Sequence, residues 1–145
     1  MESLGFTNVF QLLLKHKKKF VGHNCMYDFL FLYSHFIEEL PQDYNLYKKN
    51  LFDSFPQIFD TKFIMKETKF KETLKQNSHL GYCYEVAKKN ESGLFDKVDI
   101  KLAKGFEAYS EEILDNPRLH EAGYDAFITG YVFAKTFPTF SISEQ

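Results

Sequence analysis

Two short apolar segments, set among helical patterns, constrain the fold of this chain more than any other feature. They read KFVGH at 19–23, which we expect to form a short buried strand, and QIFD at 57–60, which we expect to form a second strand. Helical patterns lie before and between them, over 7–17, 24–38 and 44–55. Because parallel strands need a long crossover connection, this order of helix, strand, helix, helix and strand predicts an α/β fold with a parallel sheet.

The residues after the second strand predict further helices. We expect a helix at 80–90, a turn at NESG (90–93), a polar and acidic segment at 94–118, and a helix of about 17 residues from His120. The predicted caps of the first two helices are Thr7 or Asn8, and Asn24. The apolar residues of the last helix are Tyr124, Phe127, Ile128, Tyr131 and Phe133.

Length and composition predict one domain with an aromatic core. The chain has 145 residues, 44% of them hydrophobic and 18% aromatic, which is enough for one core. We assign 1–138 to this domain and 139–145 to a C-terminal tail. The net charge is −2, yet 16 lysines fall within 1–104. A lysine-rich part beside an acidic part suits a protein that contacts phosphates and holds cations, although any single lysine is more simply a solvated surface residue.

Other function classes receive no support from the sequence. Cys25 and Cys83 match neither a disulfide framework nor a metal-ligand spacing, so we interpret them as packing residues. The longest apolar run, FLFLY, is five residues, whereas a membrane span needs about 20. The N-terminus lacks a signal-peptide pattern. We therefore expect an intracellular protein without a membrane segment.

Asp28 is a lone carboxylate in an otherwise apolar helix. Because apolar residues surround it on nearly every side, we expect the carboxylate to be partly enclosed by protein. An enclosed carboxylate needs a structural hydrogen bond or a bound cation, and the residues alone leave both open. The location after GHN, at the carboxyl end of a predicted strand, favours a ligand site, and Gly22 would allow close backbone approach.

The sequence HEAGYD at 120–125 holds a second pair of polar residues. Inside one regular helix, His120 and Asp125 would lie about 140° apart, so they converge only if the helix begins after His120. Gly123 and Asn116–Pro117 favour such a late start. The alternative is that Glu121 and Asp125 lie on a solvated face. Carboxylate oxygens without thiolates favour Mg²⁺ over zinc, and the other histidines are interpreted as surface or hydrogen-bonded residues: His16, His35 and His79.

Three segments together carry a family resemblance. VGHNCMYDFL, FPQIFDTKFI and LHEAGYDAFITG, in this order and spacing, resemble the nuclease domain of the poly(A)-specific ribonuclease family, including its pre-piRNA trimming relatives. These are DEDD 3'-to-5' exonucleases of ribonuclease H-like fold. The resemblance extends over most of 1–137 and leans toward the trimmer branch. It implies a ribonuclease H-like α/β fold of which this chain is the C-terminal half, with parallel strands and flanking helices and without the N-terminal antiparallel strands.

The resemblance also implies roles for individual residues. Asp28 and Asp125 match metal-binding acids, and His120 matches the histidine beside the attacking water. Such enzymes use two divalent ions, Mg²⁺ with Mn²⁺ as an alternative. Expected partners are single-stranded RNA 3' ends, either poly(A) or pre-piRNA, and a second copy in a homodimer; the expected location is the cytoplasm, the nucleus or both. Further residues expected to contact substrate are Lys19, His23, Asn24 and Lys62.

One family motif is absent from this sequence. Relatives supply two acids from an Asp-x-Glu on an earlier strand, and none of the eight aspartates here begins that motif. Asp60 could stand in, but we interpret it as a helix cap or strand-end hydrogen-bond acceptor. We therefore expect the chain to be inactive alone, as part of a longer Mg²⁺-dependent exoribonuclease. The alternatives are a non-catalytic RNA-binding or protein-interaction module with a degenerate nuclease fold, and an interaction domain with no nucleic-acid role.

Overall fold

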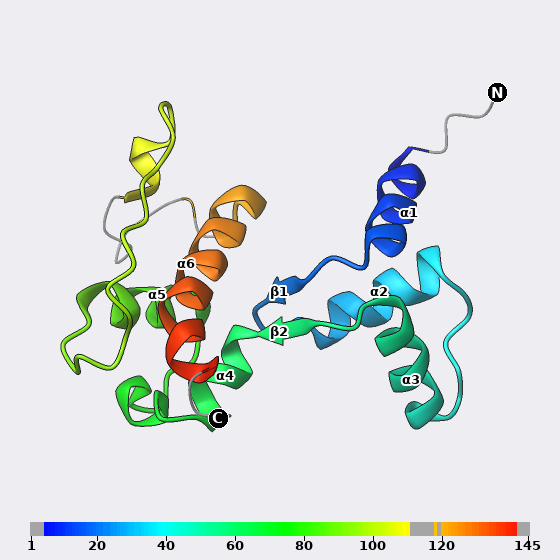
Figure 1. The fold of residues 1–145 in the computed structure, drawn as a ribbon, viewed down its shortest axis with the longest axis horizontal. Helices are drawn as coiled ribbons and strands as arrows, with labels where there is room; N and C mark the ends of the chain where they lie inside the picture. The colour runs from blue at the N-terminus through cyan, green and yellow to red at the C-terminus, as the bar shows by residue number, and fades with distance from the viewer. Residues whose placement is uncertain (1–4, 111–117, 119, 142–145) are drawn as a thin grey trace. The chain divides into compact units, whose positions relative to one another are not determined.

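The computed structural model describes residues 5–110, 118 and 120–141, and only the backbone at 138–141. The chain divides into two compact units, Met1–Phe59 and Asp60–Gln145, called here the N-terminal and the C-terminal unit. Their elements, coloured along the chain in Figure 1, are α1 (Phe6–His16), β1 (Phe20–Gly22), α2 (Met26–Phe36), α3 (Tyr44–Ser54), β2 (Ile58–Asp60), α4 (Thr61–Glu67), the 3₁₀ turn η1 (Lys71–Leu74), α5 (Leu80–Lys89), the 3₁₀ turn η2 (Glu107–Ser110) and α6 (Ala122–Ser141).

The strands β1 and β2 pair in a two-stranded sheet. Their arrows point the same way in Figure 1, and the N–H of Phe20 donates to the carbonyl oxygen of Gln57 at 2.9 Å. This confirms a mixed helix and strand structure with a small parallel sheet. Both strands are half-buried along their length, so the prediction that KFVGH is a buried strand was wrong.

The caps predicted for the first two helices were also wrong. Gly5 precedes α1 with φ 52° and ψ −129°, a conformation open mainly to glycine, so Thr7 and Asn8 lie inside the helix. The residue before α2 is Cys25. Asn24 instead takes φ 60° in the turn after β1, a left-handed conformation that asparagine tolerates better than most residues.

Phenylalanine rings form the core of the N-terminal unit, which agrees with the aromatic composition. Phe10, Phe29 and Phe55 are buried together with Cys25. The Phe55 ring lies 4.8 Å from that of Phe20, and the Phe10 ring 5.7 Å from that of Phe55, both edge to face. This edge-to-face geometry is the favoured one for aromatic pairs. The cluster joins α1, α2 and the two strands around the end of α3.

Gly22 allows a close approach, but by the protein itself. A Cβ at this position would lie 2.5 Å from Cβ and 2.7 Å from Sγ of Cys25. Gly22→Ala is therefore expected to lower the free energy of unfolding by about 1–3 kcal/mol, because a packed group must move. Urea denaturation checks this. As a control, Gly130→Ala on α6 meets nothing within 4 Å and should stabilise by about 0.5–1 kcal/mol; equal effects of the two would contradict the prediction.

The short helix α4 follows β2 without a break and was not predicted. The Asp60 side chain accepts hydrogen bonds from the N–H groups of Lys62 at 2.9 Å and Phe63 at 3.3 Å. Asp60 is thus both the last residue of β2 and the N-cap of α4, which confirms its interpretation as a cap.

The helices α5 and α6 pack together in the C-terminal unit. Tyr84 and Tyr124 are buried, and the Tyr84 ring meets the Tyr131 ring edge to face at 4.7 Å. The predicted helix at 80–90 is therefore confirmed, and so is the predicted last helix, although it begins at Ala122 and not at His120. The turn at 90–93 is also confirmed, since the N–H of Gly93 donates to the carbonyl oxygen of Asn90 at 3.0 Å. Among the described residues, no helix is long and apolar enough to span a bilayer.

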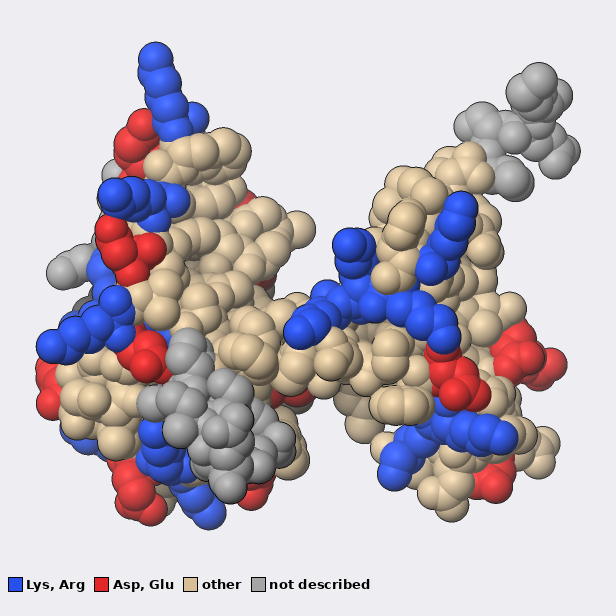
Figure 2. All heavy atoms as spheres, viewed as in Figure 1, with Lys and Arg blue, Asp and Glu red and all other residues tan. Residues whose placement is uncertain are grey.

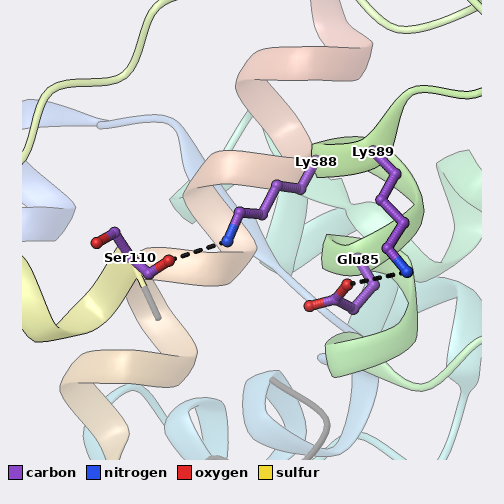
Figure 3. Close-up of polar contacts among 4 residues, drawn as sticks. All are labelled: Glu85, Lys88, Lys89 and Ser110. Atoms are coloured by element: carbon purple, nitrogen blue, oxygen red, sulfur yellow. Dashed lines mark hydrogen bonds and ion pairs between the residues drawn. The ribbon is translucent and has the colours of Figure 1, made fainter. Parts of the chain in front are cut away.

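The polar segment at 94–110 is held against these helices. Lys88 Nζ donates to the carbonyl oxygen of Ser110 at 2.9 Å, as Figure 3 shows, beside an ion pair of 3.8 Å between Lys89 and Glu85. Lys135 Nζ on α6 donates to the carbonyl oxygen of Val98 at 2.6 Å. Residues 111–117 of the predicted acidic segment, and 142–145 of the predicted tail, lie outside the described residues.

Candidate functional site

Asp28 lies in the first turn of α2 and is exposed. The expectation that protein encloses it was wrong, because only one face of this helix is buried. Phe29 and Tyr33 face the core, whereas the Tyr27 and Phe31 side chains are 64% and 65% exposed. Asp28 lines an open hollow of about 380 Å³ with four residues of α2: Phe31, Leu32, His35 and Phe36. Because this carboxylate is exposed beside aromatic side chains, a ligand can bind to it without a conformational change.

Three of the predicted substrate contacts belong to the same part of the N-terminal unit. His23 and Asn24 form the turn that joins β1 to α2 at the carboxyl end of the strand, and Lys19 directly precedes β1. Lys19 and Asn24 are exposed, and His23 is half-buried. Basic side chains gather over the end of α1 and the segment that leads to β1 in Figure 2. This region therefore presents positive charge beside the turn that precedes Asp28.

His120 and Asp125 converge at the start of α6. The helix begins at Ala122, after His120, which is the condition under which the two residues can meet. The N–H of His120 donates to Oδ1 of Asp125 at 3.4 Å. His120 is exposed with φ 78°, and Asp125 is half-buried. Asn116–Pro117, from which the sequence predicts the late start, lie outside the described residues.

Lys62 belongs to the C-terminal unit, and its charge affects Cys83 on the helix α5. It is half-buried in the first turn of α4, and its charge acts to lower the pKa of the Cys83 thiol. Burial of Cys83 outweighs this effect and raises that pKa to about 11. Cys25 and Cys83 are both buried and do not form a disulfide, so their interpretation as packing residues is confirmed.

The predicted site residues are shared between the two units. Lys19, His23, Asn24 and Asp28 come from one unit, and Lys62, His120 and Asp125 from the other. Within the described parts of the chain, no three His, Cys, Asp or Glu side chains form a group that could hold a metal ion. The donor chemistry of Asp28 and Asp125 fits a hard divalent cation, but neither unit supplies a full ligand set from its described residues.

The groups with strongly raised pKa values lie in the core instead. Desolvation raises the pKa of Tyr84 to about 12, with smaller contributions from Tyr124, Tyr131 and Glu85. The pKa shifts therefore report packing between α5 and α6 and do not mark a catalytic group.

The other histidines agree with their interpretation as surface residues, since His16, His35 and His79 are exposed.

Because the pKa of Tyr84 is raised, the stability of the C-terminal unit should fall at alkaline pH. Because the folded state holds this proton more tightly than the unfolded state, the stabilisation is complete below pH 10.0 and is lost as the pH rises toward about 12. Tyr84→Phe should flatten the fall in unfolding free energy above pH 10, as urea denaturation at several pH values would show. The exposed Tyr27→Phe is the control; equal slopes for Tyr84→Phe and the parent chain would contradict the expectation.

Three lysines that the sequence prediction did not select line one hollow of the C-terminal unit. Lys66, Lys71 and Lys75 surround a space of about 480 Å³ beside η1. The signal that could have found them is the density of lysines over 62–75, which contains five. A helical or strand period does not detect it, because the segment turns between α4 and η1.

Comparison with known proteins identifies the family. Residues 1–133 match the family described as "CAF1 family ribonuclease". The chain is 40% identical over 141 residues to the pre-piRNA 3'-exonuclease trimmer of Bombyx mori, covering 91% of this chain and 24% of that protein. It is 35% identical over 136 residues to the poly(A)-specific ribonuclease PNLDC1 of Mus musculus (93% and 25%) and 33% identical over 132 residues to the poly(A)-specific ribonuclease PARN of Xenopus laevis (91% and 20%).

The matched region is a limited part of each relative. The chain spans a quarter or less of the length of these proteins. Asp28, His120 and Asp125 all fall within the residues that match the family. These findings confirm the resemblance to the poly(A)-specific and pre-piRNA trimming nucleases, and the chain belongs to the CAF1 family of ribonucleases.

Proposed function

We propose that this chain forms part of a 3'-to-5' exoribonuclease that shortens single-stranded RNA, either poly(A) tails or small-RNA precursors. The main support for this proposal is that residues 1–133 match the CAF1 family of ribonucleases. Relatives named for 3'-exonuclease and poly(A)-specific activity support the substrate class. The nuclease domain would include 1–138 and form a homodimer, in line with the sequence predictions.

Asp28 and Asp125 would hold divalent metal, Mg²⁺ or Mn²⁺, in this enzyme. The metal would supply positive charge that stabilises the attacking and leaving oxygens of a phosphodiester. Asp28 can serve because it is exposed in the first turn of α2, the helix that follows β1. His120 would accept or orient a proton of the attacking water, beside the Asp125 carboxylate to which its backbone N–H already donates. Lys19, His23, Asn24 and Lys62 would contact the RNA.

Two carboxylates are too few for a two-ion site, so the 145-residue chain should be inactive alone. The sequence contains no Asp-x-Glu, and the described residues contain no group of three suitable ligands. The remaining acids would come from another segment. We propose that this chain completes a metal site when that segment is supplied.

A chimaera tests the proposal. In it, this chain replaces the matching segment of the B. mori trimmer, to which it is 40% identical. A 5'-labelled single-stranded RNA should be shortened from its 3' end when Mg²⁺ is added, and EDTA should stop the reaction. The 145-residue chain by itself is the control and should release no nucleotides. A folded, monodisperse chimaera without activity would contradict the proposal.

The second candidate is a non-catalytic RNA-binding or protein-interaction module. It is favoured by one observation, namely that no metal-ligand group occurs among the described residues. An inactive chimaera that still binds RNA would support this candidate over the enzyme. Trimming by the chimaera would exclude it.

A further inference from the structure

A lysine-lined hollow lies in the C-terminal unit, beside the turn η1. Lys66 comes from the last turn of α4 and Lys71 from η1, and Lys75 directly follows η1. Together with Gln76 and Ser78 they line a space of about 480 Å³, which is within the size range of ligand pockets. All three lysines are exposed, so their ammonium groups are available to a ligand from solvent.

The charge of this hollow is unbalanced. Lys66, Lys71 and Lys75 make no ion pair within the described part of the chain, whereas Lys89 and Lys101 each pair with a carboxylate. Glu72 is the one acid that lines the hollow. Three like charges around one space repel each other, and an anion that enters the space removes this repulsion. The hollow therefore fits a phosphate group better than a neutral ligand.

An aromatic side chain lies on the same helix. Phe63 of α4 is 64% exposed, and Lys66 follows it by three residues, so the two side chains share a helix face. Exposed aromatic rings stack nucleobases, and neighbouring lysines bind the phosphates between those bases. A phosphopeptide or a lipid headgroup would use the lysines but has no need of the ring.

We infer that Lys66, Lys71, Lys75 and Phe63 form an RNA-binding subsite, in which the lysines contact backbone phosphates and the ring stacks a base. The identity of the polyanion as RNA rests on the proposed function. The subsite belongs to α4 and the turn that follows it, whereas His120 and Asp125 lie just before and in the first turn of α6. In Figure 1, this green segment lies toward the red C-terminal end of α6, away from its orange first turn. The subsite would thus hold nucleotides apart from those that His120 and Asp125 contact.

Salt-dependent binding of the 145-residue chain to fluorescent oligo(A) tests the inference. For single strands, each lost phosphate contact lowers the slope of log K against log salt by about 0.7. The triple variant Lys66→Gln, Lys71→Gln, Lys75→Gln should therefore lose about 2 in slope and bind at least about tenfold more weakly near 0.1 M salt. The matched control is the triple variant Lys97→Gln, Lys101→Gln, Lys104→Gln, which removes the same charge from exposed lysines of the same unit and should keep nearly the parent slope.

The ring is tested separately from the charges. Phe63→Ala should weaken binding by about tenfold, because stacking is worth about 1–3 kcal/mol per base, without changing the salt slope. Phe52→Ala is the control, since Phe52 is 62% exposed and lies on α3. Circular dichroism would confirm that each variant keeps the helix content of the parent chain.

Three results would overturn the inference. They are an unchanged slope in the Lys66, Lys71 and Lys75 variant, an equal loss in both triple variants, or a loss of binding to phosphatidylserine vesicles while RNA affinity is unchanged. The trimming assay with the chimaera distinguishes failure of this inference from failure of the proposed function. If the chimaera trims RNA but the Lys66, Lys71 and Lys75 variant keeps the parent salt slope, the inferred subsite is wrong and the proposed function stands. If the Lys66, Lys71 and Lys75 variant has a lower salt slope but the chimaera does not trim RNA, the subsite stands and the proposed nuclease function is wrong.

Discussion

Asp28→Asn in the chimaera is expected to lower 3'-end trimming by about 10²–10³-fold. The substitution keeps the shape of the side chain but removes the negative charge that would hold metal, and loss of one element of transition-state charge stabilisation costs about this much. Because Asp28 is exposed, the unfolding free energy should change by less than about 0.5 kcal/mol. Initial rates on 5'-labelled RNA, measured at several Mg²⁺ concentrations, check the expectation.

The matched control is Asp53→Asn. Asp53 is also an exposed aspartate of the N-terminal unit, on α3, so its variant makes the same change in charge. It should trim at the parent rate. If Asp28→Asn trims as fast as Asp53→Asn, Asp28 does not hold metal and its assignment fails.

Phe55→Ala is expected to produce the largest loss of stability, about 3–5 kcal/mol in the free energy of unfolding. The Phe55 side chain is 1% exposed, and its ring contacts those of Phe10, Phe20 and Phe29 at 5.7, 4.8 and 5.9 Å. Removal of the ring therefore leaves a cavity where α1, β1, α2 and the end of α3 meet. Urea denaturation, followed by circular dichroism, measures the effect.

Phe52→Ala provides the comparison for this experiment. Phe52 lies three residues earlier, and its side chain is 62% exposed, so its loss should cost less than about 1 kcal/mol. If Phe52→Ala and Phe55→Ala destabilise the chain equally, the aromatic cluster does not organise the N-terminal unit as described.

The local pattern of residues predicted most helices but not the short helix α4. Helices α1, α3 and α5 begin or end within about a residue of the predicted ranges because apolar spacing is a local property. Helix α4 has seven residues, too few to show a helical period. Asp60 also belongs to both β2 and the cap of α4, so no turn residue separates the two elements.

The contact between His120 and Asp125 could be predicted from the sequence, but the exposure of Asp28 could not. The pairing of His120 with Asp125 depends on where one helix begins, which Gly123 and the preceding residues indicate. The exposure of Asp28 depends on which face of α2 packs, and a helix with apolar residues on all sides does not reveal this. Whether Asp28 and Asp125 meet depends on contacts between distant segments, about which local periodicity carries no information.

We propose that Asp28 and Asp125 hold divalent metal together in the complete enzyme. Mn²⁺ binding to the chimaera, measured by electron paramagnetic resonance, tests it through a double-mutant cycle of Asp28→Asn and Asp125→Asn. If the two carboxylates share a site, each single variant should weaken Mn²⁺ binding, and the double variant should be much less affected than the sum of the two predicts. Independent, additive losses, or unchanged affinity in either single variant, would contradict the claim.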